Sequence, residues 1–162
     1  MTPADVAALV RDDMAALRDA RVFAHVSSLL LTPPWPLRVW VPRYSGEVYE
    51  GFLVLSHPSG AAVAYCPRGY DPAAPWGLVG TPNEPPTSAA WCYDWYPRFL
   101  DVYFDSKAVT DLAIWRVRER RPRREPAWMS DELPWEEAWE RVYALRAASP
   151  ECRYDCEHPV TY

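Results

Sequence analysis

The chain has 162 residues, of which 49% are hydrophobic, and a formal net charge of −5. This length suits one compact domain and is short for two. The hydrophobic content excludes wholesale disorder, and the negative charge argues against a general nucleic-acid binder, which needs a basic surface.

Two helices are predicted at the start of the chain. Thr2 and Pro3 form a helix start, because a Thr hydroxyl can cap the first turn and Pro fits within it. The apolar residues that follow share one helical face: Val6, Leu9, Val10, Met14 and Leu17. Asp19 is predicted to cap a second short helix, although that segment also fits an extended conformation. The proline-rich run at 32–36 ends it.

A β-sheet is predicted to begin after these helices. Residues 37–41 form the first strand, and residues 48–55 and 61–66 form a hairpin around the turn at 56–60. The segment 67–90 holds six prolines and three glycines. It is interpreted as a long, stiff loop, which either engages a partner or folds back over the sheet.

A second hairpin is predicted at residues 97–118. Leu100, Val102 and Phe104 alternate with three polar or aromatic residues, and side chains two apart on a strand share a face. The outward face would then carry Asp101, Tyr103 and Asp105. The returning strand covers residues 109–117, which are rich in β-branched and aromatic side chains.

The remainder of the chain is predicted to hold a linker and one helix. Six arginines fall between Arg116 and Arg124, and the prolines that follow favour a solvated linker at 118–130 over a nucleic-acid site. Residues 134–148 are predicted as the C-terminal helix, with its tryptophans on the sheet. The fold class is therefore α+β, as a single domain over 1–162. Its mainly antiparallel sheet has about five strands, built from two hairpins and flanked by N-terminal helices and one C-terminal helix.

Few residues point to chemistry. Cys152, Cys156 and His158 offer three zinc-ligand types, but their spacing is not that of a zinc knuckle, so no metal site and no cofactor are expected. His57 could act as a base beside Cys66 or Cys92, yet nothing local orients such a pair. The phosphate-loop and zinc-protease motifs are absent from the sequence. The interpretation is a protein without enzymatic activity, and a small enzyme using His57 with a cysteine or carboxylate is the alternative.

The cellular setting is also predicted. The N-terminus carries acidic residues where a signal peptide needs a basic start, and no apolar stretch reaches transmembrane length. A bacterial cytoplasmic protein with reduced thiols, and with neither membrane nor nucleic-acid partner, is therefore expected. It would be a monomer or a homodimer.

In size, acidity and content of Trp and Tyr (nine and ten), the whole chain resembles the immunity proteins of bacterial toxin systems. The resemblance implies a module that binds a cognate toxin and blocks its active site. No motif carries it, so it assigns no residue role. Independently, carboxylates and aromatic anchors are predicted to form the contact surface on the loop and the outward strand face. These residues are Tyr70, Asp71, Trp76, Asn83, Glu84, Asp101, Tyr103 and Asp105. A structural or phage-derived assembly protein is the second alternative.

Overall fold

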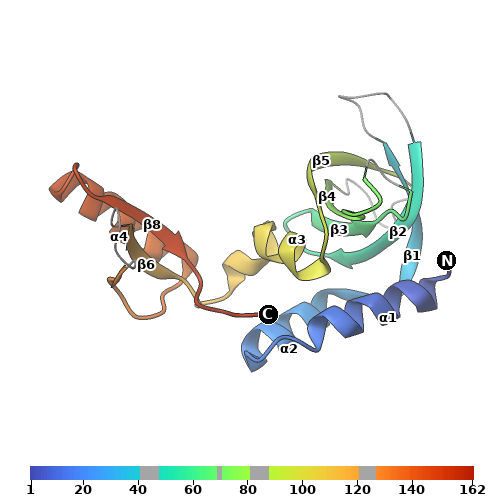
Figure 1. Ribbon diagram of the computed structural model, residues 1–162, viewed down its shortest axis with the longest axis horizontal. Coiled ribbons are helices and arrows are strands. Elements are labelled where there is room, and N and C mark those ends of the chain that lie inside the picture. Colours follow the sequence, from blue (N-terminus) through green and yellow to red (C-terminus); the bar gives the residue numbers. More distant parts are fainter. Residues whose placement is uncertain (41–47, 69–70, 81–87, 121–126) are drawn as a thin grey trace. The chain divides into compact units, whose positions relative to one another are not determined.

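The computed structural model describes residues 1–40, 48–68, 71–80, 88–120 and 127–162 (Figure 1). Their contacts group into two compact units. Unit 1 comprises Met1–Val109 with Tyr162, and unit 2 comprises Thr110–Thr161. The predicted α+β class is confirmed. No helix in these described residues has the length and apolar character that a membrane span requires.

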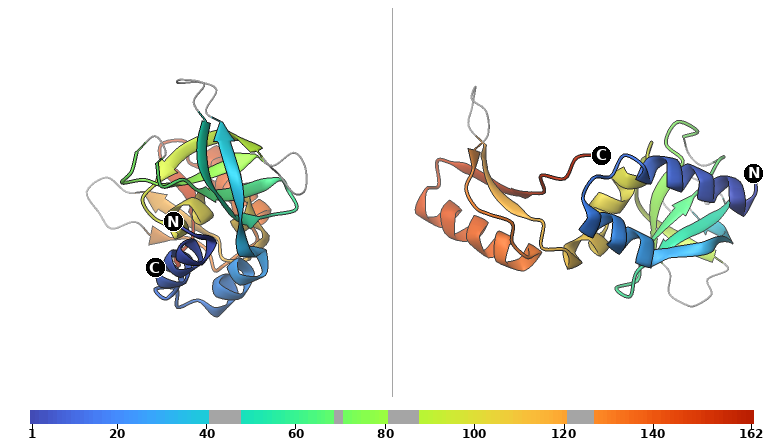
Figure 2. Two further views of the ribbon diagram at one scale, coloured as in Figure 1. Left: turned by 90° about the vertical axis from the view of Figure 1, so that its right-hand side faces the viewer. Right: turned by 90° about the horizontal axis from the view of Figure 1, so that it is seen from below.

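Unit 1 begins with the two predicted helices, α1 (Pro3–Met14) and α2 (Ala20–Leu29). Thr2 and Asp5 form a capping box, because the Thr2 hydroxyl accepts from the Asp5 N–H and the Asp5 carboxylate accepts from the Thr2 N–H. Asp19 caps α2 by accepting the backbone N–H groups at its start. Both helices lie beside the sheet, and α1 packs on the first strand (Figure 2).

Five strands follow and close into a barrel: β1 (Leu30–Trp40), β2 (Val48–Ser56), β3 (Ala61–Tyr65), β4 (Trp76–Gly80) and β5 (Ser88–Tyr96). Successive strands pair antiparallel, and β5 closes the barrel by pairing parallel to β1. The predicted β2–β3 hairpin is confirmed. Small residues such as Ala62 and Ala64 suit the narrow interior, which they share with Leu37, Val39, Leu53, Cys66 and Val79.

Two predictions for this sheet are wrong. The segment 67–90 is not one long loop, because residues 76–80 form β4 between β3 and β5. The first strand begins at Leu30 rather than at residue 37, and it contains the proline-rich run. Its pairing with β2 shifts register between Leu30 and Trp35, so Pro33 and Pro34 are not required to donate regular ladder bonds.

The second predicted hairpin is also wrong. Residues Phe99–Asp105 form the helix α3, and a 3-10 turn, η1 (Lys107–Asp111), follows it. Most of α3 is buried: Phe99, Leu100, Val102, Tyr103 and Phe104. Only the end of the predicted returning strand pairs as β structure: Trp115 forms an isolated bridge with Leu133, and β6 begins at Arg116.

Unit 2 is a three-stranded antiparallel sheet covered by one helix. Its elements are β6 (Arg116–Arg120), β7 (Ala127–Trp128), α4 (Trp135–Ala148) and β8 (Arg153–Glu157), with strand order β7-β6-β8. The C-terminal helix is confirmed as α4, and it packs on β6 and β8 around Val117, Val142 and Tyr154. The prediction of a linker at 118–130 is wrong at both of its ends, because Arg118 and Glu119 of β6 pair with Trp128 and Ala127 of β7.

Candidate functional site

Some of the predicted contact residues are accessible. Asp71 is exposed and accepts the N–H of Ala73 at 2.8 Å, and Asp105 is exposed and accepts from the Tyr96 hydroxyl. Asp101 is half-buried beside Tyr162. The pKa of Tyr162 is raised mainly by burial, and the neighbouring Asp101 carboxylate raises it further. Three other predicted contact residues lie outside the described residues: Tyr70, Asn83 and Glu84.

The two remaining aromatic residues are not on the surface. Trp76 is 4% exposed and Tyr103 is fully buried, so both predictions of an outward ring are wrong. Trp76 packs edge-on between Tyr65 and Phe99. Tyr103 faces inward because its segment is a helix, in which the strand alternation used to place it outward does not apply.

Tyr103 instead belongs to a cluster of polar rings in unit 1. Its hydroxyl is hydrogen-bonded to Nδ1 of His25 on α2 at 2.7 Å. His25 faces His57, which lies in the β2–β3 turn. Their ring centroids are 6.4 Å apart, and the interplanar angle is 65°. Nδ1 of His57 is 2.7 Å from the Ser59 hydroxyl and also accepts the Ser59 N–H at 3.2 Å. The structure therefore gathers two imidazoles and two hydroxyls from three elements.

A thiol nucleophile is not favoured by the environment of Cys66. The side chain is buried in the barrel interior, and burial raises its pKa to about 12. Because the thiolate is the reactive form, a thiol that stays protonated at neutral pH is inert. Cys66 is therefore not suited to act as the thiol nucleophile beside His57. The structure does not describe the side chain of Cys92.

The Cys152, Cys156 and His158 segment is part of unit 2's packing rather than a free tail. Cys152 and Cys156 border the core of unit 2 around β8, and the pKa of Cys156 is raised to about 12, mainly by burial. His158 packs edge-on against Trp115, with 5.6 Å between ring centroids. In the described part of the chain, these three side chains do not gather as a set of metal ligands.

The three arginines of the run that the structure describes, Arg116, Arg118 and Arg120, are engaged within unit 2. Along β6, Arg118 and Arg120 form ion pairs with Glu157, and Arg120 also pairs with Asp155. Arg116 donates to the Ser130 carbonyl at 2.9 Å. Cations already matched by carboxylates make a poor phosphate surface.

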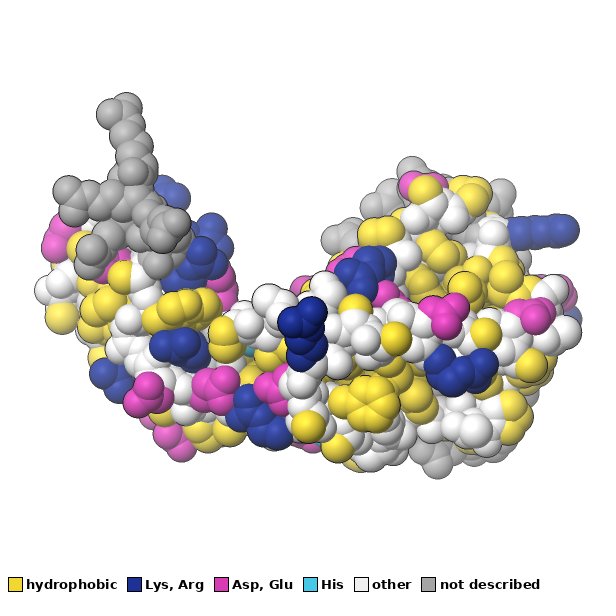
Figure 3. All heavy atoms as spheres, turned by 60° about the horizontal axis from the view of Figure 1, so that its bottom comes forward, with side chains coloured by type: hydrophobic (Ala, Val, Ile, Leu, Met, Phe, Trp, Pro, Cys, Tyr) yellow, Lys and Arg dark blue, Asp and Glu magenta, His cyan; other side chains and the backbone are white. Residues whose placement is uncertain are grey.

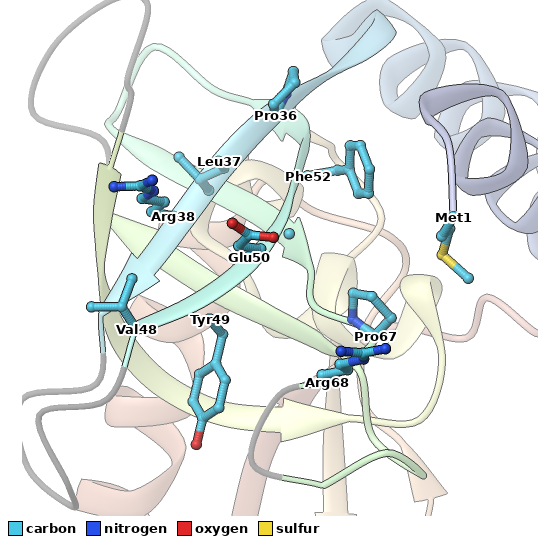
Figure 4. Close-up of a pocket in the computed structure, with 11 residues that line it drawn as sticks. Met1, Pro36, Leu37, Arg38, Val48, Tyr49, Glu50, Phe52, Pro67 and Arg68 are labelled. Carbon is cyan, nitrogen blue, oxygen red and sulfur yellow. The ribbon is translucent and has the colours of Figure 1, made fainter.

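An open hollow of about 890 Å³ lies on the outer side of β1 and β2 in unit 1 (Figure 4). In this view the Glu50 carboxylate lies between the guanidinium groups of Arg38 and Arg68, and Phe52 and Pro67 add apolar surface. The described residues that line it include one carboxylate and no histidine, cysteine or serine. Its described lining therefore offers no pair of acid–base side chains and no Ser or Cys nucleophile.

The outward side of α4 combines charge with an exposed ring. Glu136, Glu140, Tyr143 and Ala147 recur at helical spacing and are exposed, and we call these four residues the α4 acidic face. Tyr143 is 61% exposed, and its ring lies 5.6 Å from that of Trp139, which borders the core of unit 2. On the side of the molecule that Figure 3 presents, acidic side chains lie among basic and hydrophobic ones.

The sequence contains the signal for this face, although no contact role was predicted from it. The apolar spacing that places Trp135, Ala138, Trp139, Val142 and Leu145 toward the sheet leaves Glu136 and Glu140 on the solvent side. Tyr143, four residues after Trp139, lies beside that ring at the border between the two sides. The cluster around His25 has no comparable signal, because its members come from distant parts of the chain.

Comparisons of the chain with known protein families, with curated proteins and with solved structures find no match.

Proposed function

We propose that this chain is a protein-binding module of the immunity type, which neutralises a cognate bacterial toxin by covering its active site. The observation that carries the proposal is the α4 acidic face, where the 61% exposed ring of Tyr143 lies on the same helical side as Glu136 and Glu140. A solvent-facing aromatic ring among carboxylates is the composition expected of a binding anchor with a charged surround.

The charge of this face indicates the partner's chemistry. Toxins that act on nucleic acids or nucleotides need a basic cleft for phosphate, and carboxylates can occupy such a cleft in place of phosphate. Glu136 and Glu140 would speed the encounter through long-range attraction, and burial of the Tyr143 ring would slow dissociation. Because the face is carried on a regular helix that packs on a sheet, little conformational freedom is lost on binding.

The test begins with the gene next to that of this chain, which the proposal expects to encode a toxin domain. Purified toxin and chain are titrated by calorimetry at two salt concentrations, and toxin activity is measured with and without the chain. The Glu136→Lys/Glu140→Lys variant should weaken binding by about tenfold or more and reduce its salt dependence. Tyr143→Ala should also weaken binding, mainly by raising the dissociation rate.

The matched control is Asp12→Lys/Glu151→Lys, which changes the net charge equally at exposed carboxylates that do not belong to the α4 acidic face. It should keep most of the affinity and full inhibition of the toxin. Equal losses in the two charge-reversed variants would reject the face, and a neighbouring toxin that remains fully active with excess chain would reject the function.

A further inference from the structure

The imidazoles of His25 and His57 point to a metal site in unit 1. One nitrogen of His25 and one of His57 lie within 4.8 Å of each other. Two nitrogens bound to one tetrahedral Zn²⁺ ion, each at about 2.0–2.1 Å, are about 3.4 Å apart, so the two nitrogens need to approach by about 1.4 Å or less. We propose that His25 and His57 together bind a divalent transition-metal ion, with Zn²⁺ the metal that two imidazoles suit under physiological conditions.

The small remaining distance can be closed by the turn that carries His57. His57 follows the last residue of β2, and the next three residues of the turn, Pro58, Ser59 and Gly60, are exposed. Gly60 has φ of +82°, and no atom lies within 4 Å of the position that a Cβ would take there, so the turn is not packed against other residues at this point. His25 is the fixed partner, because it lies on a capped helix and is bonded to the buried Tyr103.

Each ring has a hydroxyl beside Nδ1, where metal-binding histidines have their supporting acceptor. A histidine that binds metal through Nε2 carries its proton on Nδ1 and donates it to a neighbouring acceptor, which fixes the ring. The Tyr103 hydroxyl lies 2.7 Å from Nδ1 of His25, and the Ser59 hydroxyl lies 2.7 Å from Nδ1 of His57. In the metal-free structure Nδ1 of His57 accepts the Ser59 N–H at 3.2 Å. Binding of the ion at Nε2 of His57 moves the ring proton to Nδ1, so this bond is given up and the Ser59 hydroxyl oxygen accepts the Nδ1 proton.

A metal held in this way would connect elements that are distant in sequence. His25 belongs to α2, and His57 belongs to the β2–β3 turn of the barrel. An ion that binds the folded chain and not the unfolded chain stabilises the fold by mass action, so Zn²⁺ should raise the thermal midpoint of unfolding. This inference does not depend on the proposed toxin partner.

The test is a titration of the full, reduced chain with ZnCl₂ by calorimetry, together with thermal unfolding with and without ZnCl₂. We expect one Zn²⁺ per chain. Loss of an outer-shell partner of a metal ligand already weakens metal binding by about tenfold, so His57→Gln, which removes a ligand, should weaken binding by at least that much. His57 is half-buried at the start of a turn, so His57→Gln should fold, and its metal-free unfolding midpoint verifies this.

His158→Gln is the matched control, since the chain has three histidines and His158 lies in unit 2. This variant, and Cys152→Ser/Cys156→Ser, should bind Zn²⁺ as the wild type does. The proposal is overturned if His57→Gln retains wild-type affinity, if only the His158 or cysteine variants lose it, or if the wild type shows no binding up to about 1 mM Zn²⁺.

Discussion

Asp13 at the end of α1 binds Arg98, the residue that precedes α3, through two guanidinium nitrogens at 2.6 and 2.8 Å. The same carboxylate accepts the backbone N–H of Leu100 at 2.8 Å. Because α3 has no side-chain cap of its own, Asp13 supplies the acceptor that a local cap residue normally provides. The hydrogen bond from Arg98 to Asp13 raises the pKa of Arg98.

Asp13→Ala should therefore lower the free energy of unfolding by about 2 kcal/mol, since it removes a partly buried ion pair and leaves a helix N–H without its acceptor. The Arg98 side chain is 40% exposed, so solvent screening limits how much of this free energy comes from the ion pair. Urea unfolding followed by circular dichroism measures the change. Asp12→Ala is the control: Asp12 is exposed on the same helix, and its removal should change stability by less than about 0.5 kcal/mol. Equal effects at the two positions would contradict the capping role.

Gly51→Ala should strongly destabilise the barrel. A Cβ at this position would lie 2.4 Å from the Tyr65 carbonyl oxygen and 2.7 Å from Sγ of Cys66, and the oxygen belongs to the backbone of β3. Overpacking of this kind costs about 1–3 kcal/mol. Gly60→Asn is the comparison, because Gly60 has open space and a positive φ that Asn tolerates. A thermal melt should show the larger loss at Gly51, and a well-folded Gly51→Ala protein of unchanged stability would refute the close packing.

Tyr103→Phe should cost about 1 kcal/mol, because it removes the hydrogen bond to His25 while keeping the buried ring. Tyr143→Phe makes the same chemical change at a 61% exposed ring and should leave stability unchanged. Chemical unfolding of the two variants in parallel distinguishes the effect of losing the hydrogen bond from the effect of removing a tyrosine hydroxyl. A neutral result for Tyr103→Phe would show that the hydrogen bond contributes no net stability.

Cys66 should make the fold sensitive to alkaline pH. Its pKa is raised by burial from an ordinary 9.0 to about 12, so the folded state holds a proton that the unfolded state releases. The stability is present below pH 9 and is lost as the pH rises toward 12, with a slope of up to about 1.4 kcal/mol per pH unit. Urea unfolding between about pH 8.5 and 10.5 should show a shallower slope for Cys66→Ala. Val79→Ala removes bulk from the same core without an ionisable group, so its slope should match the wild type.

The elements predicted correctly are those with local signals. Thr2 and Asp19 cap the first two helices as expected, and the turn that ends at Gly60 joins β2 to β3. The C-terminal helix follows from its own apolar spacing and from Pro134 before its first residue. In each case, residues within one or two turns of each other determine the conformation.

The helix α3 could not be predicted in this way. Leu100, Val102 and Phe104 alternate like a strand, but Phe99 and Tyr103 are buried as well, so apolar residues face nearly every direction. When both sides are buried, the period of the pattern does not distinguish helix from strand. The acceptor that favours the helix, Asp13, is 87 residues from the N–H it binds.

The candidate sites also differ in whether a local sequence signal predicts them. The α4 acidic face is implied by the spacing that predicts the helix, whereas the inward position of Tyr103 depends on α3 being helical. The neighbourhood of His25 and His57 requires α2 and the β2–β3 turn to be placed in space. Pairwise proximity of this kind is a property of the tertiary fold and not of any short segment.

The parallel pairing of β1 with β5 has a consequence for synthesis of the chain. Arg38 pairs with Ser88 and Trp40 with Ala90, so the first strand lacks one neighbour until residues 88–90 have left the ribosome. Such distant pairing slows folding, and two open strand edges are available for association with other chains meanwhile. Nascent chains that end after β4 should therefore be the forms that most need a chaperone, and the arrival of β5 should end that dependence.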